Sequence, residues 1–236
     1  MISLFLLLLH FFADQPGGIR DELKTDQLVV VTTSGWNQVQ GTMHTYQWKA
    51  NRWSPVLMNI PIVTGRSGLA WGKGLHNPNL NKGKLKKEGD GNAPAGIYYL
   101  SGLFGYQYIN AKMNSLVVDE KTLCIDDVKS AYYNRIVRLD TVKKDWDSAE
   151  TMRMKSDVYK FGIFVDYNSN PANPGKGSCI FMHIWSKSTA PTAGCTAMTE
   201  ANILKLIRFL DKSKNPVLVQ VPQSEYRKMK LLYKLP

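Results

Sequence analysis

The chain has 236 residues, of which 44% are apolar, enough for one substantial globular domain. Its 30 Lys and Arg exceed its 19 Asp and Glu, and the formal net charge of +11 favours an anionic partner such as nucleic acid, acidic lipid or a carboxylate-rich polymer. The sequence has no zinc-finger spacing, helix-turn-helix signature or RNP-like aromatic motif, so we do not expect a nucleic-acid partner.

The chain begins with an apolar run over residues 2–13, about the length of the apolar part of a signal peptide and too short to span a bilayer comfortably. No Lys or Arg precedes this run, and Phe11 stands where a small residue normally precedes a cut after Ala13. We interpret residues 1–20 as an export signal, with an uncleaved anchor or a buried first element as alternatives. No later stretch approaches the roughly 18 continuous apolar residues of a membrane-spanning helix.

From Gln27 onward, short apolar stretches alternate with turns rich in Gly, Pro and Asn, a pattern typical of a β-rich protein. The predicted strands cover residues 28–33, 41–48, 53–62, 97–100, 115–118, 159–165, 178–185 and 217–221. No linker divides the chain, so we expect one domain over residues 27–222, followed by a basic tail over residues 223–236. This tail is predicted to pack on the domain or to bind an acidic surface.

Two stretches between the predicted strands show neither a helical nor a strand period. Residues 65–96 are dense in Gly, Lys and Asn and predict a long surface loop; Trp71 and Pro94 favour a functional loop over a merely solvated one. Residues 140–157 are polar and irregular, with a few helical turns possible.

The predicted strand over residues 178–185 alternates in polarity. Cys179, Phe181, His183 and Trp185 fall on one face, and Ile180, Met182 and Ile184 on the other. Further along, Thr199 is a suitable N-cap for a helix with an apolar stripe, which ends before Pro216. The stripe consists of Ile203, Leu204, Ile207 and Leu210.

The chain has three cysteines, which is an odd number for an exported protein. A disulfide between Cys124 and Cys179 would leave Cys195 as the free thiol; the alternative is that Cys124 and Cys179 are buried small apolar residues.

Cys195 directly follows Gly194, on a loop that leads towards the predicted helix. A flexible backbone at this place can direct amides at a developing oxyanion, and a nearby helix N-terminus favours the thiolate. A base must also take the thiol proton, and His183 on the adjoining strand is the candidate. Without further information, a His and a Cys at this separation are more often coincidence than catalysis.

His183 followed by Pro191-Thr192-Ala193-Gly194-Cys195 resembles the signature of the YkuD-type L,D-transpeptidases, a histidine followed by Ser or Thr, one residue, Gly and Cys. Upstream segments resemble the same superfamily, so the resemblance covers about residues 27–222. These segments are residues 27–33 with Trp36, residues 87–91 and 93–96, residues 126–127 and 132–134, and residues 166–168.

The resemblance implies a β-sandwich or β-barrel catalytic domain, a cysteine acyl-enzyme and peptidoglycan stem peptides as substrate. It makes Cys195 the nucleophile, His183 the general base and Gly194 a residue of the oxyanion loop. We expect a protein of the periplasm or cell wall, and the net positive charge favours peripheral association with an anionic envelope surface. Neither a cofactor nor a metal is expected, because no spacing of His, Cys or carboxylates resembles a metal site.

Three positions depart from the commoner motif of the family. That motif has His where Ala193 stands, Gly where Ile184 stands and Arg where Ala197 stands. The thiol chemistry survives these changes, whereas the usual substrate contacts need not. Transpeptidation, carboxypeptidase action and crosslink hydrolysis share one acyl-enzyme and differ in whether an amine or water accepts the acyl group. A non-catalytic wall-binding module is the rival from another class.

Four further residues are predicted to contact substrate: Thr192, Trp185, Asp90 and His76. Asp90 and His76 lie in the glycine-rich stretch, where a turn residue and a solvated histidine are the alternatives. Glu88, Asp126 and Asp127 are weaker candidates, for which turn roles are at least as well supported.

Overall fold

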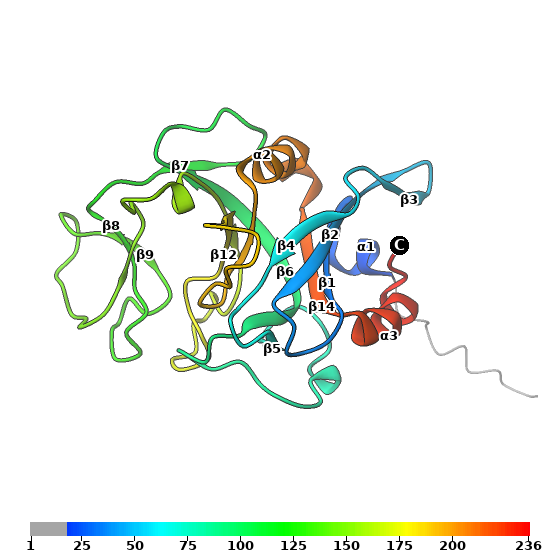
Figure 1. Ribbon diagram of the computed structural model, residues 1–236, viewed down its shortest axis with the longest axis horizontal. Helices are drawn as coiled ribbons and strands as arrows, with labels where there is room; N and C mark the ends of the chain where they lie inside the picture. Colours follow the sequence, from blue (N-terminus) through cyan, green and yellow to red (C-terminus); the bar gives the residue numbers. More distant parts are fainter. Residues whose placement is uncertain (1–17) are drawn as a thin grey trace, which may run out of the picture.

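The computed structural model describes residues 18–236 and shows a single, mainly β domain with a barrel-like sheet (Figure 1). The β-rich, single-domain fold predicted from the sequence is therefore confirmed. The predicted export signal falls on residues 1–20, nearly all of which lie outside the described residues. Within the described residues, no helix is long and apolar enough to cross a bilayer.

The main sheet closes on itself. Its strands follow the order β1-β14-β6-β11-β12-β13-β4-β2-β3, and β1 also pairs with β2. Two short strands, β5 and β7, pair with β6 outside this path. The strands are β1 (Gln27–Thr33), β2 (Gln40–Lys49), β3 (Arg52–Pro55), β4 (Ile60–Val63), β5 (Leu69–Trp71), β6 (Ala93–Gly105), β7 (Ser115–Val117), β11 (Phe161–Val165), β12 (Phe181–Ile184), β13 (Thr196–Met198) and β14 (Val217–Pro222).

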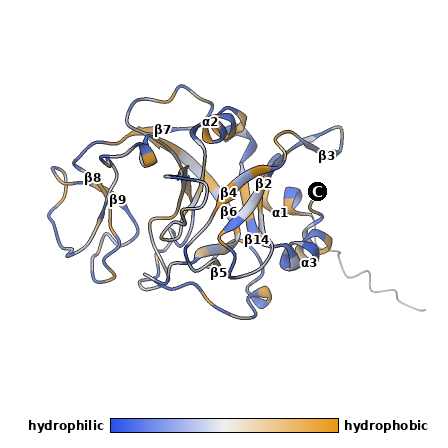
Figure 2. Cartoon of the chain, in the orientation of Figure 1, coloured by the Kyte–Doolittle hydropathy of each residue, from blue (hydrophilic) through white to orange (hydrophobic). Residues whose placement is uncertain are grey.

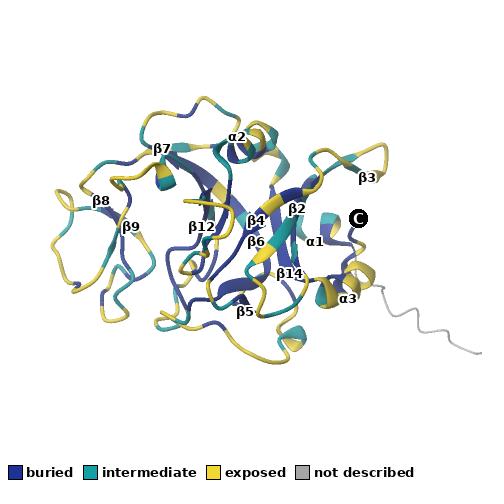
Figure 3. Cartoon of the chain, in the orientation of Figure 1, coloured by how far each residue is buried: buried dark blue, intermediate teal, exposed yellow. Residues whose placement is uncertain are grey.

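Strands β1 and β14 pair in parallel and are buried on both faces, which explains their continuous apolar sequences. Val29 and Val31 of β1 join one core cluster, while Leu28 and Val30 join a second cluster on the other face. Figure 3 shows these central strands almost entirely buried, and Figure 2 shows apolar residues recurring along them. The centre of the sheet thus forms a firm base for the loops around it.

Helices cover both faces of this part of the sheet. Helix α2 (Glu200–Phe209) packs on the first core cluster, and Thr199 caps it as predicted, because its hydroxyl accepts from the amide of Asn202. Helix α1 (Ile19–Leu23) and helix α3 (Gln223–Tyr233) lie side by side on the second cluster (Figure 1). The tail predicted over residues 223–236 therefore packs on the domain.

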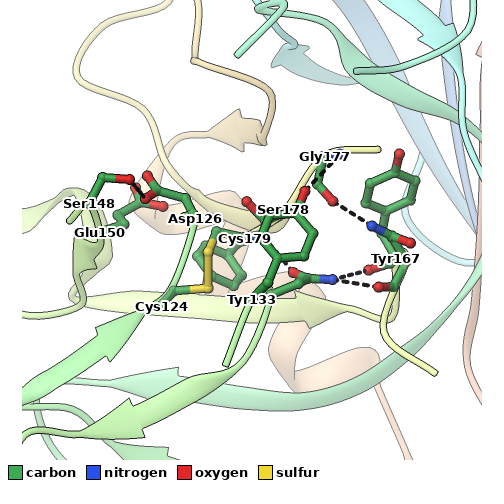
Figure 4. Close-up of a disulfide and its surroundings, with 12 residues drawn as sticks. Cys124, Asp126, Tyr133, Ser148, Glu150, Tyr167, Gly177, Ser178 and Cys179 are labelled. Carbon is green, nitrogen blue, oxygen red and sulfur yellow. Dashed lines mark hydrogen bonds between the residues drawn. A yellow bond between two sulfur atoms is a disulfide. The ribbon is translucent and has the colours of Figure 1, made fainter. Parts of the chain in front are cut away.

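A separate three-stranded sheet, which we call the small sheet, lies beside the main sheet (Figure 1). Its order is β10-β8-β9, with β8 (Thr122–Cys124), β9 (Ile136–Arg138) and β10 (Glu150–Thr151). A disulfide joins Cys124 of β8 to Cys179, which precedes β12 (Figure 4). The proposed cysteine pairing is therefore confirmed, and Cys195 is the free, buried thiol.

A side chain also ties the small sheet to the main sheet. Asn134, next to β9, accepts from the amide of Cys179 (2.9 Å) and donates to the carbonyl oxygens of Tyr167 and Asn168 (2.9 and 2.8 Å). The covalent bond and these contacts converge on the segment that leads into β12. The position of the small sheet is therefore linked to that of β12.

Two strand predictions and one loop prediction need correction. Residues 53–62 form two strands because the chain turns after Pro55 and Asn59 has a positive φ of 56°. Residues 65–96 contain β5, a short 3-10 helix (Pro78–Leu80) and the start of β6, since Trp71 is buried against the second core cluster. The strand predicted over residues 178–185 covers only Phe181–Ile184, because Cys179 adopts a left-handed conformation (φ 54°).

The predicted alternation along this segment nevertheless holds. Ile180, Met182 and Ile184 join the first core cluster, whereas Cys179 and Phe181 join a different cluster, which also contains Cys195.

Candidate active site

A cavity of about 500 Å³ opens where β12, the loop before β13 and the small sheet meet. His183, Trp185, Thr192, Gly194 and Cys195 all line it. These predicted site residues come from segments that are close in sequence, and the parallel pairing of β12 with β13 brings the segments together. The fold thus gathers five of the predicted residues around one hollow.

Cys195 lies immediately before β13, with a side chain that is 6% exposed. The amide of Phe181 donates to its Sγ (3.3 Å), and the thiol donates to the carbonyl oxygen of Cys179 (3.6 Å). Burial raises the pKa of the thiol far above its ordinary value, and the charge of Glu150 raises it further. The resting group is therefore a protonated thiol, and its use as a nucleophile would require a base.

His183 stands in the middle of β12, directly opposite Ala197 of β13. Since Cys195 precedes Ala197 by two residues, alternation along the chain places it on the same side as His183, and both line the cavity. His183 Nδ1 donates to the carbonyl oxygen of Ile184 (2.8 Å), which leaves Nε2 as the basic nitrogen. Burial lowers the pKa of His183 from an ordinary value of 6.5 to about 4, so the imidazole is neutral at pH 7.

The imidazole and the thiol are thus both neutral at rest and do not form an ion pair. Their side chains make no direct hydrogen bond in the described part of the chain. Such contacts are commonly long in a substrate-free site and shorten when the substrate binds. What the structure does fix is the tautomer of the base and the position of the thiol.

The loop over residues 192–194 is held by its own hydrogen bonds. The Thr192 hydroxyl donates to the carbonyl oxygen of Cys195 (2.6 Å) and accepts from the amide of Gly194 (3.1 Å). The backbone of Thr192 bonds to Thr64 and Arg66, which follow β4. Thr192 therefore shapes the turn before the thiol, and the Gly194 amide already has an acceptor in the resting state.

The structure does not bring Asp90 or His76 to the wall of this cavity. Asp90 accepts from Lys86 Nζ (2.7 Å), and Lys86 does line the cavity, so Asp90 holds one of its cations in place. His76 lines a different hollow beside Trp71, and its two ring nitrogens contact Asn81 (2.7 Å) and the amide of Ile97 (3.3 Å). A substrate contact for His76 stays a prediction.

Sequence reasoning missed several charged or polar residues of the cavity. Glu150 of β10 and Tyr159, at the end of a 3-10 helix (Asp157–Tyr159), both line it. Burial raises the pKa of Glu150 from an ordinary value of 4.5 to about 7. The segment that carries Glu150 shows no period, so only the fold reveals the proximity. Arg66 and Lys86, together with the weaker sequence candidates Glu88 and Asp126, complete the charged lining.

The cavity carries two kinds of charge. Arg66 and Lys86 provide cations, and Glu88, Asp126 and Glu150 provide carboxyl groups. Glu88 is fixed by the hydroxyl of Ser178 (2.7 Å) and by the hydroxyl of Tyr133. Figure 4 shows Asp126 and Glu150 together beside the disulfide. Across residues 18–236, no group of three or more His, Cys, Asp and Glu residues could hold a metal ion.

Comparison with known proteins gives a family match over most of the chain. The family described as YkuD, L,D-transpeptidase catalytic domain, matches residues 39–219. No curated protein matches the chain. A solved structure, the helical cell shape determining protein Pgp2 from Campylobacter jejuni, aligns at 15% identity and a TM-score of 0.39. The alignment covers 86% of this chain and 52% of that one, so the chain spans about half the length of Pgp2. On the strength of the family match, the chain belongs to the YkuD family of L,D-transpeptidase catalytic domains.

Proposed function

We propose that the protein is an L,D-transpeptidase that acts on peptidoglycan stem peptides through a Cys195 acyl-enzyme, with His183 as the general base. One observation carries the proposal: His183 of β12 and Cys195, immediately before the adjacent β13, line one cavity, and Nδ1 of His183 is fixed by the carbonyl oxygen of Ile184. This arrangement leaves Nε2 free to take the thiol proton.

The reaction begins when His183 Nε2 takes the proton from Cys195 and Sγ attacks the carbonyl carbon next to a D-amino acid. Backbone amides around Gly194 stabilise the resulting oxyanion. The peptide C–N bond then breaks, and His183 returns the proton to the leaving amine. A second stem-peptide amine attacks the thioester, loses a proton to His183 and releases the thiol.

The charged lining of the cavity suits a substrate that carries both carboxylate and ammonium groups. Arg66 and Lys86 are the candidate partners of a peptide carboxylate, with Lys86 held by Asp90 (2.7 Å). Trp185 and Thr192 border the same hollow and are the candidate contacts for the peptide itself. These assignments extend the proposal from the nucleophile to the substrate.

The disulfide between Cys124 and Cys179 supports a site of action outside the cytoplasm. Disulfides persist in oxidising compartments such as the bacterial periplasm, where stem peptides are also found. We therefore propose that the protein is exported and acts in the periplasm or cell wall.

The test is to incubate wild type, Cys195→Ala and His183→Gln with defined muropeptides, and to follow adducts by intact-mass spectrometry and products by chromatography. We expect an adduct on wild type alone, and a crosslinked product that names the amine as acceptor. A shortened product with the same adduct would instead identify a hydrolase. Binding that falls with salt, survives Cys195→Ala and yields no adduct would establish a wall-binding module.

A further inference from the structure

The buried ring of Tyr159 packs against His183, the candidate base, and against other aromatic rings. Its side chain is 3% exposed, and its ring packs edge-on against the ring of His183, with the centroids 5.1 Å apart. Edge-on contacts with Phe104 (5.6 Å) and Phe181 (5.8 Å) surround the rest of the ring. Because this packing fixes the ring, the hydroxyl is the part of the Tyr159 side chain that can change its hydrogen-bond acceptor.

In the resting structure the Tyr159 hydroxyl donates to Glu150. Glu150 comes from β10, so this bond links the small sheet to a residue that touches His183. The pKa of Tyr159 lies well above its ordinary value because of burial and then because of the nearby Cys195 and Glu150, so the hydroxyl remains a donor at every physiological pH.

Tyr159 and Cys195 belong to the same buried cluster and line the same cavity, beside His183. Burial and the charge of Glu150 raise the pKa of the Cys195 thiol, and the neighbouring Tyr159 hydroxyl lowers it. Tyr159 thus has two acceptors within reach, the carboxylate of Glu150 and the sulfur of Cys195.

We infer that Tyr159 and Glu150 form a positioning pair for the Cys195 nucleophile, in which the Tyr159 hydroxyl leaves Glu150 and donates to the thiolate as it forms. The inference rests on the proposed cysteine chemistry. It assigns roles to two residues beyond the proposed nucleophile and base.

The physical need for such a donor follows from the burial of the thiol. A thiolate formed at Cys195 is cut off from water, and the amide of Phe181 is its one observed backbone donor (3.3 Å). A hydroxyl that moves from Glu150 to sulfur supplies a second donor when the charge appears. Glu150 keeps that hydroxyl close to the sulfur until the charge forms.

The charge of Glu150 makes the pair sensitive to pH. The pKa of Glu150 is about 7, raised by burial and then by the neighbouring Asp126 and Glu88. Lys86 acts on Cys195 in the opposite sense, because its charge favours the thiolate. Above pH 7 Glu150 is a carboxylate, which binds the Tyr159 hydroxyl and repels the Cys195 thiolate. Below pH 7 the carboxyl group is neutral, and both interactions are weaker.

The experiment measures the rate at which iodoacetamide alkylates Cys195, which requires thiolate but no substrate. Tyr159→Phe keeps the ring on His183 and removes the hydroxyl, and we expect it to react about tenfold more slowly at pH 8. Glu150→Gln keeps an acceptor for the hydroxyl and removes the charge, and we expect it to react about tenfold faster at pH 8. At pH 5.5 the rate of Glu150→Gln should approach that of wild type.

Tyr133→Phe is the matched control, since Tyr133 also donates to a glutamate of the cavity, Glu88, but acts on no atom of Cys195. Its alkylation rate should equal that of wild type, and near-UV circular dichroism verifies that each variant is folded. Unchanged rates in both folded test variants, or shifts in the same direction, would overturn the inference. Because alkylation is independent of muropeptides, this result is separate from the fate of the proposed transpeptidase activity.

Discussion

The main sheet and the small sheet are stabilised in different ways. In the main sheet, central strands such as β1 and β14 are buried on both faces and covered by helices α2 and α3. The small sheet has its own buried cluster of only four residues, and it is tied to the rest by the disulfide and Asn134. The four residues are Leu123, Ile125, Val137 and Trp146.

The two regions also contribute differently to the cavity. The main sheet and the loop before β13 supply Cys195 and His183, which need a fixed geometry. The small sheet and its loops supply Glu150 and Asp126, which set the charge around them. The proposed nucleophile and base therefore lie on the firm region, and Glu150, whose charge raises the pKa of the Cys195 thiol, lies on the region with the smaller core.

Removal of the disulfide should reveal most clearly that the two sheets differ in how they are stabilised. The bond closes a separation of 55 residues, for which a chain-entropy argument gives about 4 kcal/mol of stabilisation. We expect Cys124→Ala/Cys179→Ala to lose up to this amount in urea unfolding, with faster amide hydrogen exchange concentrated in β8, β9 and β10. Equal loss of protection in β1 and β14 would show that the two regions unfold as one unit.

A leucine-to-alanine substitution in each sheet should compare their contributions to stability directly. Leu218 of β14 and Leu123 of β8 are 1% and 8% exposed, and each lies in a central strand of its sheet. Leu218→Ala should lower the free energy of global unfolding by about 3 kcal/mol. Leu123→Ala should cost less globally and should instead accelerate exchange in the small sheet. A larger global loss for Leu123→Ala than for Leu218→Ala would contradict this expectation.

The pH dependence of stability should separate the contribution of His183, in the main sheet, from that of Glu150, in the small sheet. The pKa of His183 is lowered to about 4, so the unfolded chain binds a proton that the folded chain does not between pH 4 and 6.5. Stability from this group is complete above pH 6.5 and lost as the pH falls to 4. The pKa of Glu150 is raised to about 7, so its contribution is complete below pH 4.5 and lost as the pH rises to 7.

Between pH 4.5 and 6.5 the two contributions change in opposite directions. Each changes the free energy of unfolding by about 3 kcal/mol across this window. We expect a nearly flat unfolding free energy for wild type across this window. His183→Gln should become less stable as the pH rises, and Glu150→Gln more stable. Urea unfolding at pH 4.5, 5.5 and 6.5 measures all three curves; parallel curves would contradict the assignment.

The smallest effect is expected at the cap of α2. Thr199 accepts from the amide of Asn202, and Thr199→Ala should cost about 1 kcal/mol in urea unfolding. Thr199→Ser keeps the hydroxyl and should retain most of the stability. An equal loss in both variants would show that the methyl group, rather than the cap, is responsible.

Sequence patterns predicted the parts of the molecule whose burial is periodic. The continuous apolar sequence of β14, the alternation around β12 and the cap at Thr199 each carry a local signal that the structure follows. The small sheet carries none, because its strands are two or three residues long and are held by distant partners.

The candidate site likewise contains residues that carry a sequence signal and residues that carry none. Cys195 and His183 are close in sequence, and the residues around them carry a motif. Glu150 and Tyr159 reach the thiol only because β10 and the segment before β11 fold back on it. The structure pairs Asp90 with Lys86, an arrangement that depends on which way each side chain points. No periodicity encodes such directions.

The burial of Cys195 also affects its chemical lifetime. Peroxide and related oxidants attack the thiolate, and a thiol that is 6% exposed with a raised pKa offers little of it. Cys195 should therefore resist conversion to sulfenic acid in the absence of substrate, even though it belongs to the same cluster as an oxidised cysteine pair. A cysteine held in this way should survive oxidants longer than an exposed thiol of low pKa.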